Sequence, residues 1–440
     1  MAAQTSLTAR RGRKQTQIHC LRSSQNEGHR ESNLSSLRVA QGRSEPSEGF
    51  DSFTAREEIQ GFVVQEGACM KRLMNVVLCG VLVGAAVATV RAHDPRAYAK
   101  AAQASAATSA KPVPVPGISG QGKMRFRVLY TSERLPEEAK KVLVKAHGGF
   151  AVDRRPGKGE TYFALPGAGI LQISADLRTI RMLDTPEPMK TVNLHDTTIW
   201  YTREDSPYLV FPANDAGKVF TTTLDGKLVH TLDAPTAEDE FEQPEVHDYF
   251  LGRGNFAPTD VEELDGLYYI TTGYSNLDFV LTVRILSFDP FQAVWNDLAF
   301  GGKGIAHGQF NAAHGMTVPP GKKRLDVSDR PNSRIERFSP YGHYRSTLKM
   351  PAGSLPCDIN YLNEYAIVAS LDGPDPSKGA PIYILENDQL VSTIMPKEDL
   401  GLQNFKHNHN AVLRKVGNKF YIVVQAWNPG DFAVLEQVAD

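Results

Sequence analysis

The stretch GQFNAAHGMTV, residues 308–318, is one copy of a phrase that recurs along the chain. In each copy a turn leads into a short apolar strand, a Gly-containing or charged turn follows, and a second strand comes next. Repetition of this kind decides the fold more firmly than any single copy can. The other copies read HGGFAVD (147–153), LHDTTIW (194–200), PTDVEE (258–263), PCDINY (356–361) and NHNAVL (408–413).

One residue of each copy marks the period of the repeat. The markers lie at positions 147, 195, 259, 314, 357 and 409, so the spacings are 48, 64, 55, 43 and 52 residues. Six units of about fifty residues, each patterned as a small antiparallel sheet, predict an all-β, six-bladed β-propeller. Apart from residues 135–146, little helical periodicity competes with this interpretation. The strand-like segment KMRFRVLYTS (123–132) is expected to close the ring by pairing with the last blade.

The composition is that of an ordinary globular protein with enough length for a large core. The chain has 440 residues, of which 41% are hydrophobic and 22% charged, and its formal net charge is −2. A near-neutral charge gives no reason to expect a nucleic-acid partner.

The N-terminal part differs from the rest of the chain. Residues 1–69 are basic, rich in Ser and Gln and poor in apolar residues, which predicts disorder and suggests a mis-called extension. Residues 70–92 have the basic start, apolar middle and small exit residue of a signal peptide, with a membrane anchor as the alternative. We therefore expect export to the periplasm or the extracellular space. An Ala-, Ser- and Pro-rich linker is predicted over 93–122 and the propeller over 123–440.

The markers gain chemical meaning from the predicted fold. The innermost strand of each propeller blade lines the central channel, so residues at one phase form a ring around the axis. Four of the six markers are histidines, although the whole chain has only 12. Converging neutral imidazoles suit Zn²⁺, and three of them leave a position open for substrate. The ring is His147, His195, Thr259, His314, Cys357 and His409.

We predict that His195, His314 and His409 bind the metal. His147 is a candidate for a fourth ligand, but we expect it to lie elsewhere in the channel, because a closed four-ligand site would block the chemistry. The alternative for all four histidines is an ordinary packing role.

Several stretches resemble successive blades of peptidyl-α-hydroxyglycine α-amidating lyase, an NHL-type six-bladed propeller. They are FAPTDVEELDGLYYITTGYSN (256–276), the opening stretch, and LDVSDRPNSRIERFSP (325–340). The resemblance covers roughly residues 145–440. That family cleaves a peptidyl-α-hydroxyglycine into a peptide amide and glyoxylate.

The resemblance implies roles for particular residues. In the family, three histidines from alternate blades hold a zinc ion, which corresponds here to His195, His314 and His409. Tyr274 matches the catalytic tyrosine, which near a metal and an arginine would act as a general base. Arg330 matches the arginine that would pair with the substrate carboxylate or the developing charge. The resemblance also implies a structural Ca²⁺.

Two positions depart from the family pattern. The family carries an arginine on the second strand of the first blade, and GETYFALPGAG (159–169) has none, while Arg154 and Arg155 lie earlier in a turn. The family's calcium-binding Asp after the last zinc histidine is Asn410 here.

Two functions remain open at this point. The first is an exported, zinc-dependent carbon–nitrogen lyase that takes a small-molecule or peptide substrate in the central channel. The alternative is a non-enzymatic NHL propeller that binds a protein, peptide or glycan on its top face. The His, Tyr and Arg set favours the enzyme, and the missing first-blade arginine favours the binding module. A calcium-dependent lactonase is disfavoured because such sites are built from oxygen ligands.

Overall fold

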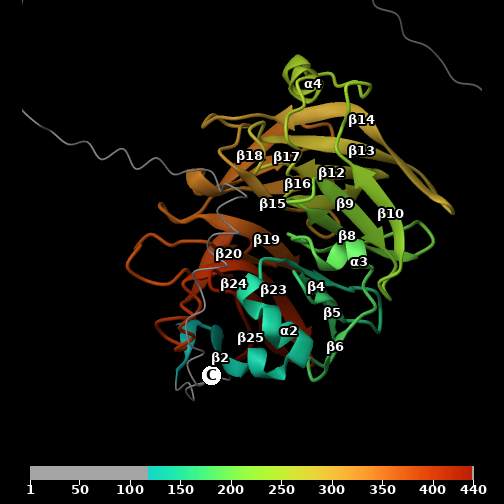
Figure 1. The fold of residues 1–440 in the computed structure, drawn as a ribbon. Coiled ribbons are helices and arrows are strands. Elements are labelled where there is room, and N and C mark those ends of the chain that lie inside the picture. Colours follow the sequence, from blue (N-terminus) through green and yellow to red (C-terminus); the bar gives the residue numbers. More distant parts are fainter. Residues whose placement is uncertain (1–116, 439–440) are drawn as a thin grey trace, which may run out of the picture. The chain divides into compact units, whose positions relative to one another are not determined.

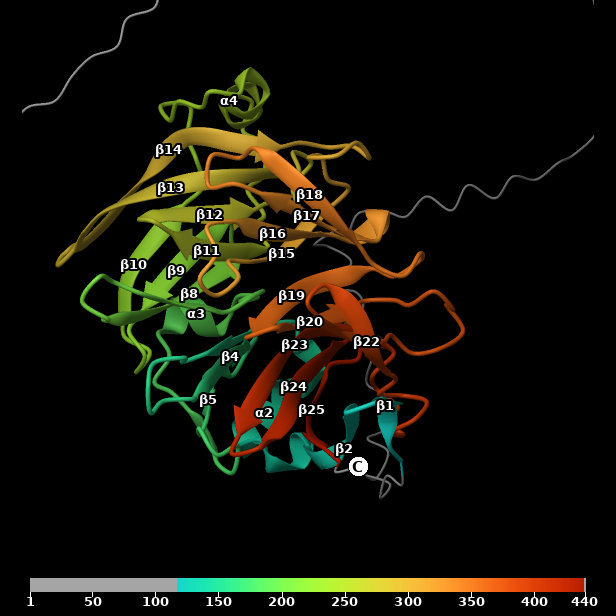
Figure 2. The same cartoon turned by 180° about the vertical axis from the view of Figure 1, so that it is seen from behind.

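The computed structural model describes residues 117–438. The predicted disordered segment, the signal segment and most of the predicted linker lie outside this range. Within it, six antiparallel sheets surround a central axis (Figures 1 and 2), so the predicted six-bladed propeller is confirmed. No helix among the described residues is long and apolar enough to span a membrane.

The first three blades are each a four-stranded meander in chain order, with the first strand innermost. Blade 1 contains β3 (Phe150–Val152), β4 (Thr161–Leu165), β5 (Gly169–Ile173) and β6 (Ile180–Met182). Blade 2 contains β7 (Thr198–Tyr201), β8 (Pro207–Ala213), β9 (Lys218–Thr222) and β10 (Leu228–Asp233). Blade 3 contains β11 (Asp260–Leu264), β12 (Leu267–Thr271), β13 (Phe279–Phe288) and β14 (Phe291–Gly301).

The last three blades follow the same plan. Blade 4 contains β15 (Ala313–Thr317), β16 (Leu325–Asp329), β17 (Arg334–Phe338) and β18 (Tyr344–Lys349). Blade 5 contains β19 (Pro356–Leu362), β20 (Tyr365–Ser370), β21 (Ile382–Glu386) and β22 (Gln389–Ile394). Blade 6 draws on both ends of the described chain: β23 (His407–Val416), β24 (Lys419–Trp427), β25 (Asp431–Gln437), β2 (Met124–Thr131) and β1 (Ser119–Gln121).

The pairing of β2 with β25 closes the ring, as the sequence predicted. Because blade 6 takes its outer strands from the N-terminal side, the first and last blades cannot separate without breaking this ladder. Strand pairing starts at Ser119, four residues before the boundary that we predicted at Lys123.

Helices are short and lie between the strands. They are α2 (Glu137–Val142), α3 (Glu187–Lys190), α4 (Pro244–Leu251) and the 3-10 turns η1 (Ser132–Arg134), η2 (Leu143–Lys145) and η3 (Arg330–Asn332). The helical pattern noted at residues 135–146 corresponds to α2 and η2.

Turn chemistry accounts for the tight hairpins. In the β11–β12 turn, Asp265 and Gly266 both have positive φ, at 55° and 87°, and Leu264 pairs with Leu267. A two-residue Asp-Gly turn of this kind matches the right-handed twist of the flanking strands.

The hydrophobic core consists of six clusters, one at each interface between neighbouring blades. At the interface of blades 6 and 1, Phe150, Phe163 and Phe432 are buried, and the rings of the last two stack at 5.5 Å. Each blade is therefore apolar on both faces, which leaves polar side chains to the channel and the outer edge.

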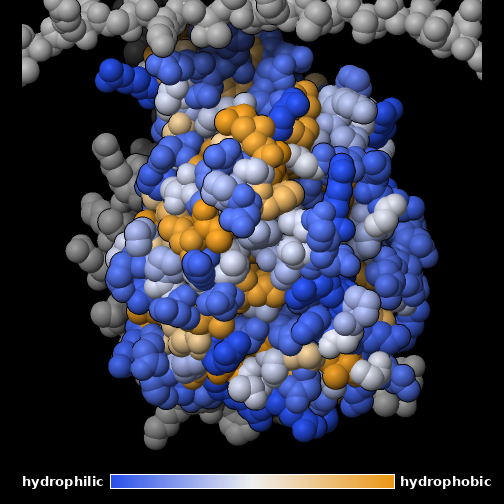
Figure 3. Space-filling model, turned by 90° about the vertical axis from the view of Figure 1, so that its right-hand side faces the viewer, coloured by the Kyte–Doolittle hydropathy of each residue, from blue (hydrophilic) through white to orange (hydrophobic). Residues whose placement is uncertain are grey.

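The outer surface is mostly hydrophilic. Figure 3 shows a side of the propeller on which apolar patches are separated by polar residues. The long hairpin of β13 and β14 carries three of the exposed large apolar side chains, Leu286, Phe288 and Val294.

Candidate metal centre

Backbone irregularities at the start of the inner strands aim the marker side chains. The pairing of the first two strands shifts register at the marker in three blades. The shift lies around His314 in blade 4, at Cys357 in blade 5 and at His409 in blade 6. A β-bulge of this kind bends the strand and re-aims the extra residue. The four marker histidines and Cys357 are all buried.

Three histidines from alternate blades have the same local environment. In each, Nδ1 faces a backbone carbonyl oxygen supplied by the next blade around the ring. A carbonyl oxygen only accepts, so Nδ1 carries the proton and Nε2 carries the lone pair. The pairs are His195 with Thr259 (2.7 Å), His314 with Cys357 (2.8 Å) and His409 with Gly148 (3.2 Å).

The rings of these three histidines gather around the Tyr274 hydroxyl, and two of their Nε2 atoms are in contact. The Nε2 atoms of His195 and His409 lie 3.2 Å apart. The hydroxyl of Tyr274 lies 3.2 Å from Nε2 of His195 and 2.9 Å from Nε2 of His314. The ring centroid of His314 is 4.7 Å from that of His195 and 5.1 Å from that of His409. The structure therefore brings together all three histidines that the sequence predicted as ligands.

The other two predicted site residues come from loops at the same end of the propeller. Tyr274 lies between β12 and β13, and Arg330 lies between β16 and β17, where the second strand of each blade returns to the marker end. A guanidinium nitrogen of Arg330 lies 3.3 Å from the Tyr274 hydroxyl, and the guanidinium carbon is 5.4 Å from the ring centroid. Both side chains are buried.

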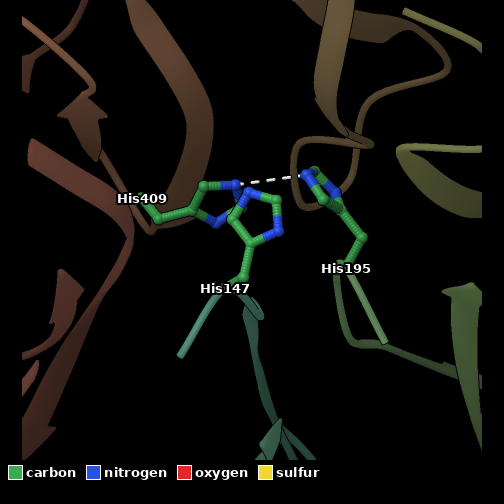
Figure 4. A group of neighbouring side chains, drawn as sticks. All are labelled: His147, His195 and His409. Atoms are coloured by element: carbon green, nitrogen blue, oxygen red, sulfur yellow. Dashed lines mark hydrogen bonds between the residues drawn. The ribbon is translucent and has the colours of Figure 1, made fainter. Parts of the chain in front are cut away.

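His147 joins the same group, so the expectation that it lies elsewhere in the channel is wrong. Its ring centroid is 4.5 Å from that of His195 and 4.3 Å from that of His409. Figure 4 shows its ring beside the hydrogen-bonding contact between the other two. Nitrogen atoms of these three buried residues all lie within 4.8 Å of one another, so the group could hold a metal ion. His147 lies between η2 and β3, three residues before the strand begins.

Burial sets the protonation of the centre. Burial, together with the positive charge of Arg330 and the neighbouring histidines, holds the pKa of His314 well below its usual value. His314 is therefore neutral at physiological pH, as a metal ligand must be. Burial also raises the pKa of the Cys357 thiol to about 11, which keeps that thiol protonated.

A second set of polar side chains lies one residue further along the inner strands. Asp196, Asp260 and Asp358 are buried and line a cavity of about 220 Å³, together with Glu262. Burial is the main cause that raises the pKa of each of these carboxyl groups, and for Asp358 the pKa rises to about 6. The carboxyl groups also repel one another.

Asn410 connects two of these carboxylates. Its side-chain nitrogen donates to Asp358 at 2.8 Å and to Asp196 at 3.3 Å. The second carboxylate oxygen of Asp358 is buried without a hydrogen-bond partner. Asp260 accepts backbone N–H groups of Val261 and Met316.

Neither arginine near the first blade substitutes for the missing one. Arg155 forms an ion pair with Asp153 at 2.7 Å, and Arg154 lines the carboxylate cavity.

The buried carboxylates were not predicted, although the sequence contains a pattern that marks them. LHD, PTD and PCD each place an Asp directly after a marker, at positions 196, 260 and 358. Trp427, whose ring centroid lies 5.5 Å from that of His147, was not predicted either, because a single aromatic residue at a strand end carries no distinctive pattern.

No family model matches the chain, and no curated protein matches it. Among solved structures, a gluconolactonase from Xanthomonas campestris is similar at 14% identity, with 75% of this chain and 99% of that chain covered and a TM-score of 0.45. A catalytically inactive virginiamycin B lyase from Staphylococcus aureus with quinupristin is also 14% identical, with 67% and 96% covered and a TM-score of 0.41. A streptogramin B lyase is 12% identical, with 74% and 100% covered and a TM-score of 0.41. Similarity at this level says nothing about the chemistry of the site.

Proposed function

We propose that the chain is an exported, zinc-dependent lyase that cleaves the carbon–nitrogen bond of a peptidyl-α-hydroxyglycine or a related carbinolamide. The observation that carries the proposal is the grouping of three buried histidines from alternate blades with the Tyr274 hydroxyl and the Arg330 guanidinium: Nε2 of His195 contacts Nε2 of His409, and the Tyr274 hydroxyl contacts Nε2 of His195, Nε2 of His314 and Arg330. An NHL propeller that only binds a partner has no use for this combination.

The donor set fits Zn²⁺. His195, His314 and His409 each present an imidazole whose Nδ1 faces a backbone carbonyl oxygen, which leaves Nε2 for the metal. Two tetrahedral ligands at about 2.0–2.1 Å from zinc are roughly 3.3 Å apart. The separation of 3.2 Å between Nε2 of His195 and Nε2 of His409 agrees with that value.

The remaining chemistry belongs to the protein side chains. A zinc ion in this position supplies Lewis acidity toward a substrate hydroxyl or carbonyl oxygen. Tyr274 is placed to take the hydroxyl proton, and the positive charge of Arg330 at 3.3 Å stabilises its phenolate. The carbon–oxygen double bond of glyoxylate then forms as the carbon–nitrogen bond breaks, and the departing amide nitrogen takes up the proton that Tyr274 accepted. Arg330 pairs with the substrate carboxylate.

The direct test is glyoxylate release from α-hydroxyhippurate and from a peptidyl-α-hydroxyglycine by the zinc-loaded protein. His314→Ala and Tyr274→Phe are the control variants. We expect release by the wild type and none by either variant. Wild-type protein that binds zinc and releases no glyoxylate would contradict the lyase proposal and leave the metal centre standing.

We propose Ca²⁺ as a second, structural cation in the carboxylate cavity. The support is the buried Asp196, Asp260 and Asp358, with one oxygen of Asp358 lacking a hydrogen-bond partner, since hard cations prefer oxygen ligands. The missing Asp at position 410 is then replaced by carboxylates from other blades. Calcium titration followed by thermal unfolding tests this, and an unchanged melting temperature would contradict it.

Export is proposed from the layout of residues 70–92, which lie outside the described range. The N-terminus of the mature protein, determined by mass spectrometry after expression with its own leader, tests the proposal. A mature chain that begins near residue 93 supports it, and an intact chain in the cytoplasm contradicts it.

A further inference from the structure

We infer that His147 is a hydrogen-bond donor to the bound substrate and not a metal ligand, and that Asn193 is the positioning residue that fixes its tautomer. The inference rests on the proposed function, because it assigns the other three histidines to the metal. It concerns a residue that the sequence placed in the marker ring but not in the predicted ligand set.

The environment of His147 is the reverse of that of the three proposed ligands. Its Nδ1 lies 2.7 Å from the side-chain nitrogen of Asn193, where the other three face carbonyl oxygens. An amide nitrogen only donates, so Nδ1 of His147 must accept and its proton lies on Nε2. A histidine with a protonated Nε2 has no lone pair to offer a metal at that atom.

A second amide sets the orientation of Asn193. The same Asn193 nitrogen donates to the side-chain oxygen of Asn214 at 2.9 Å. With the Asn214 amide oriented as it is here, turning the Asn193 amide over would place two side-chain oxygens at that distance, which is repulsive. The backbone N–H of Asn193 also donates to Asp215 at 2.9 Å, which holds the residue in place.

Aromatic neighbours hold the ring of His147 beside the proposed metal ligands. It lies against His195 and His409, runs nearly parallel to the Tyr274 ring at a centroid distance of 6.4 Å, and contacts Trp427. Figure 4 shows one of its nitrogens turned toward the contact between His195 and His409. The N–H therefore faces the same space as the proposed ligand lone pairs.

The proposed reaction has a use for a neutral donor at this place. When the carbon–nitrogen bond breaks, the electron pair moves to the amide nitrogen and is shared with the carbonyl oxygen of the departing amide. A hydrogen bond from Nε2 of His147 to that oxygen stabilises the developing charge, and the His147 proton stays on its nitrogen throughout. Removing one donor of this type costs about 100-fold or more in kcat.

Three variants separate a donor from a ligand: His147→Leu, His147→Gln and Asn193→Asp. We expect His147→Leu to lower kcat by about 100-fold while zinc affinity, measured by chelator competition, changes less than about threefold. His147→Gln retains an N–H donor and should recover part of kcat. His407→Gln is the control, because His407 also packs against Trp427 but its Nδ1 faces the carbonyl of Leu371. It should behave as the wild type.

Asn193→Asp tests the tautomer of His147 most specifically. A carboxylate only accepts, so it moves the His147 proton to Nδ1 and removes the Nε2–H donor. We expect kcat to fall by about 10- to 100-fold while zinc affinity stays the same or rises. Loss of zinc affinity by more than about tenfold in His147→Gln would overturn the inference, because it would make His147 a ligand.

A readout without metal or substrate keeps the inference testable if the proposed function fails. Nitrogen-15 NMR of the zinc-free protein should report a protonated Nε2 for His147 in the wild type and a protonated Nδ1 in Asn193→Asp. A wild-type protein with the proton on Nδ1 would overturn the inference regardless of activity.

Discussion

The histidine centre and the carboxylate cavity are built from consecutive residues of the same repeated phrases, and they differ in their ligand chemistry. His195 is followed by Asp196, and His409 is followed by Asn410. In a regular strand, consecutive side chains point to opposite faces. Here His409 meets His195 while Asn410 meets Asp196, and the bulge at His409 makes this possible. One phase of a repeat can therefore supply two layers of a channel.

The two layers should select different ions. The histidine centre, called here the upper layer, offers imidazole nitrogen atoms, which suit zinc. The carboxylate cavity, called the lower layer, offers carboxylate oxygens, which suit calcium. Variants that affect one layer and spare the other test this division.

The largest effect on metal binding is expected from His314→Ala. Loss of one of three ligands should lower zinc affinity by about 100-fold or more, since altering even an outer hydrogen-bond partner costs about 10–100-fold. Zinc content after dialysis measures this. Asp358→Asn, in the lower layer, is the matched control and should retain zinc. Equal zinc content in wild type and His314→Ala would remove His314 from the ligand set.

Tyr274→Phe should separate metal binding from turnover. The substitution removes only the phenol hydroxyl group, so zinc content should stay at the wild-type level while kcat falls by about 100- to 10,000-fold. Glyoxylate release and metal analysis on the same sample check both halves. Wild-type turnover in this variant would exclude Tyr274 as the proton acceptor.

Asp358→Asn should abolish the response of stability to calcium. At a calcium concentration about 100 times the dissociation constant, binding stabilises the wild type by about 2.7 kcal/mol, which corresponds to roughly 5 °C in melting temperature. The variant should show little shift, because it loses a charged ligand. An equal shift in both proteins would place calcium elsewhere.

The smallest effect is a pH-dependent one at Asp278, which accepts the backbone N–H of Ala313 next to the histidine centre. Burial raises the pKa of Asp278 to about 7, well above its unfolded value of 3.8. The folded state therefore binds more protons between these values, and its stability falls as pH rises from about 4 to 7.

Asp278→Asn removes this loss, and asparagine tolerates the positive φ of 56° at this position. We expect the variant to be more stable than the wild type at pH 8, by about 1 kcal/mol or more, and to lose that advantage at pH 5. Urea unfolding at both pH values measures the difference. A stability difference that is the same at both pH values would contradict the explanation.

The sequence was most informative where a pattern repeats. Six phrases at similar spacing predicted the six blades, and the strand-like 123–132 predicted the ring closure that β2 makes with β25. The clustering of His195, His314 and His409 followed from their common phase, because residues at one phase of a propeller share a level of the channel.

The remaining features depend on local geometry that a repeat pattern does not encode. His147 sits in a turn before the short β3, so only the path of that turn decides whether its ring reaches the centre. The tautomer of His147 depends on Asn193 and Asn214, which belong to different loops of blade 2. Asp196, Asp260 and Asp358 were visible after the markers, but a regular strand would have turned them away from the channel.

The central claim is that His195, His314 and His409 hold one zinc ion and that His147 does not. X-ray diffraction from zinc-loaded crystals, with anomalous data collected on both sides of the zinc absorption edge, tests it most directly. The account predicts a single zinc peak in the channel at about 2.0–2.1 Å from Nε2 of the three histidines. A peak bound by His147 in place of His314, or no peak at the histidine centre, would contradict it.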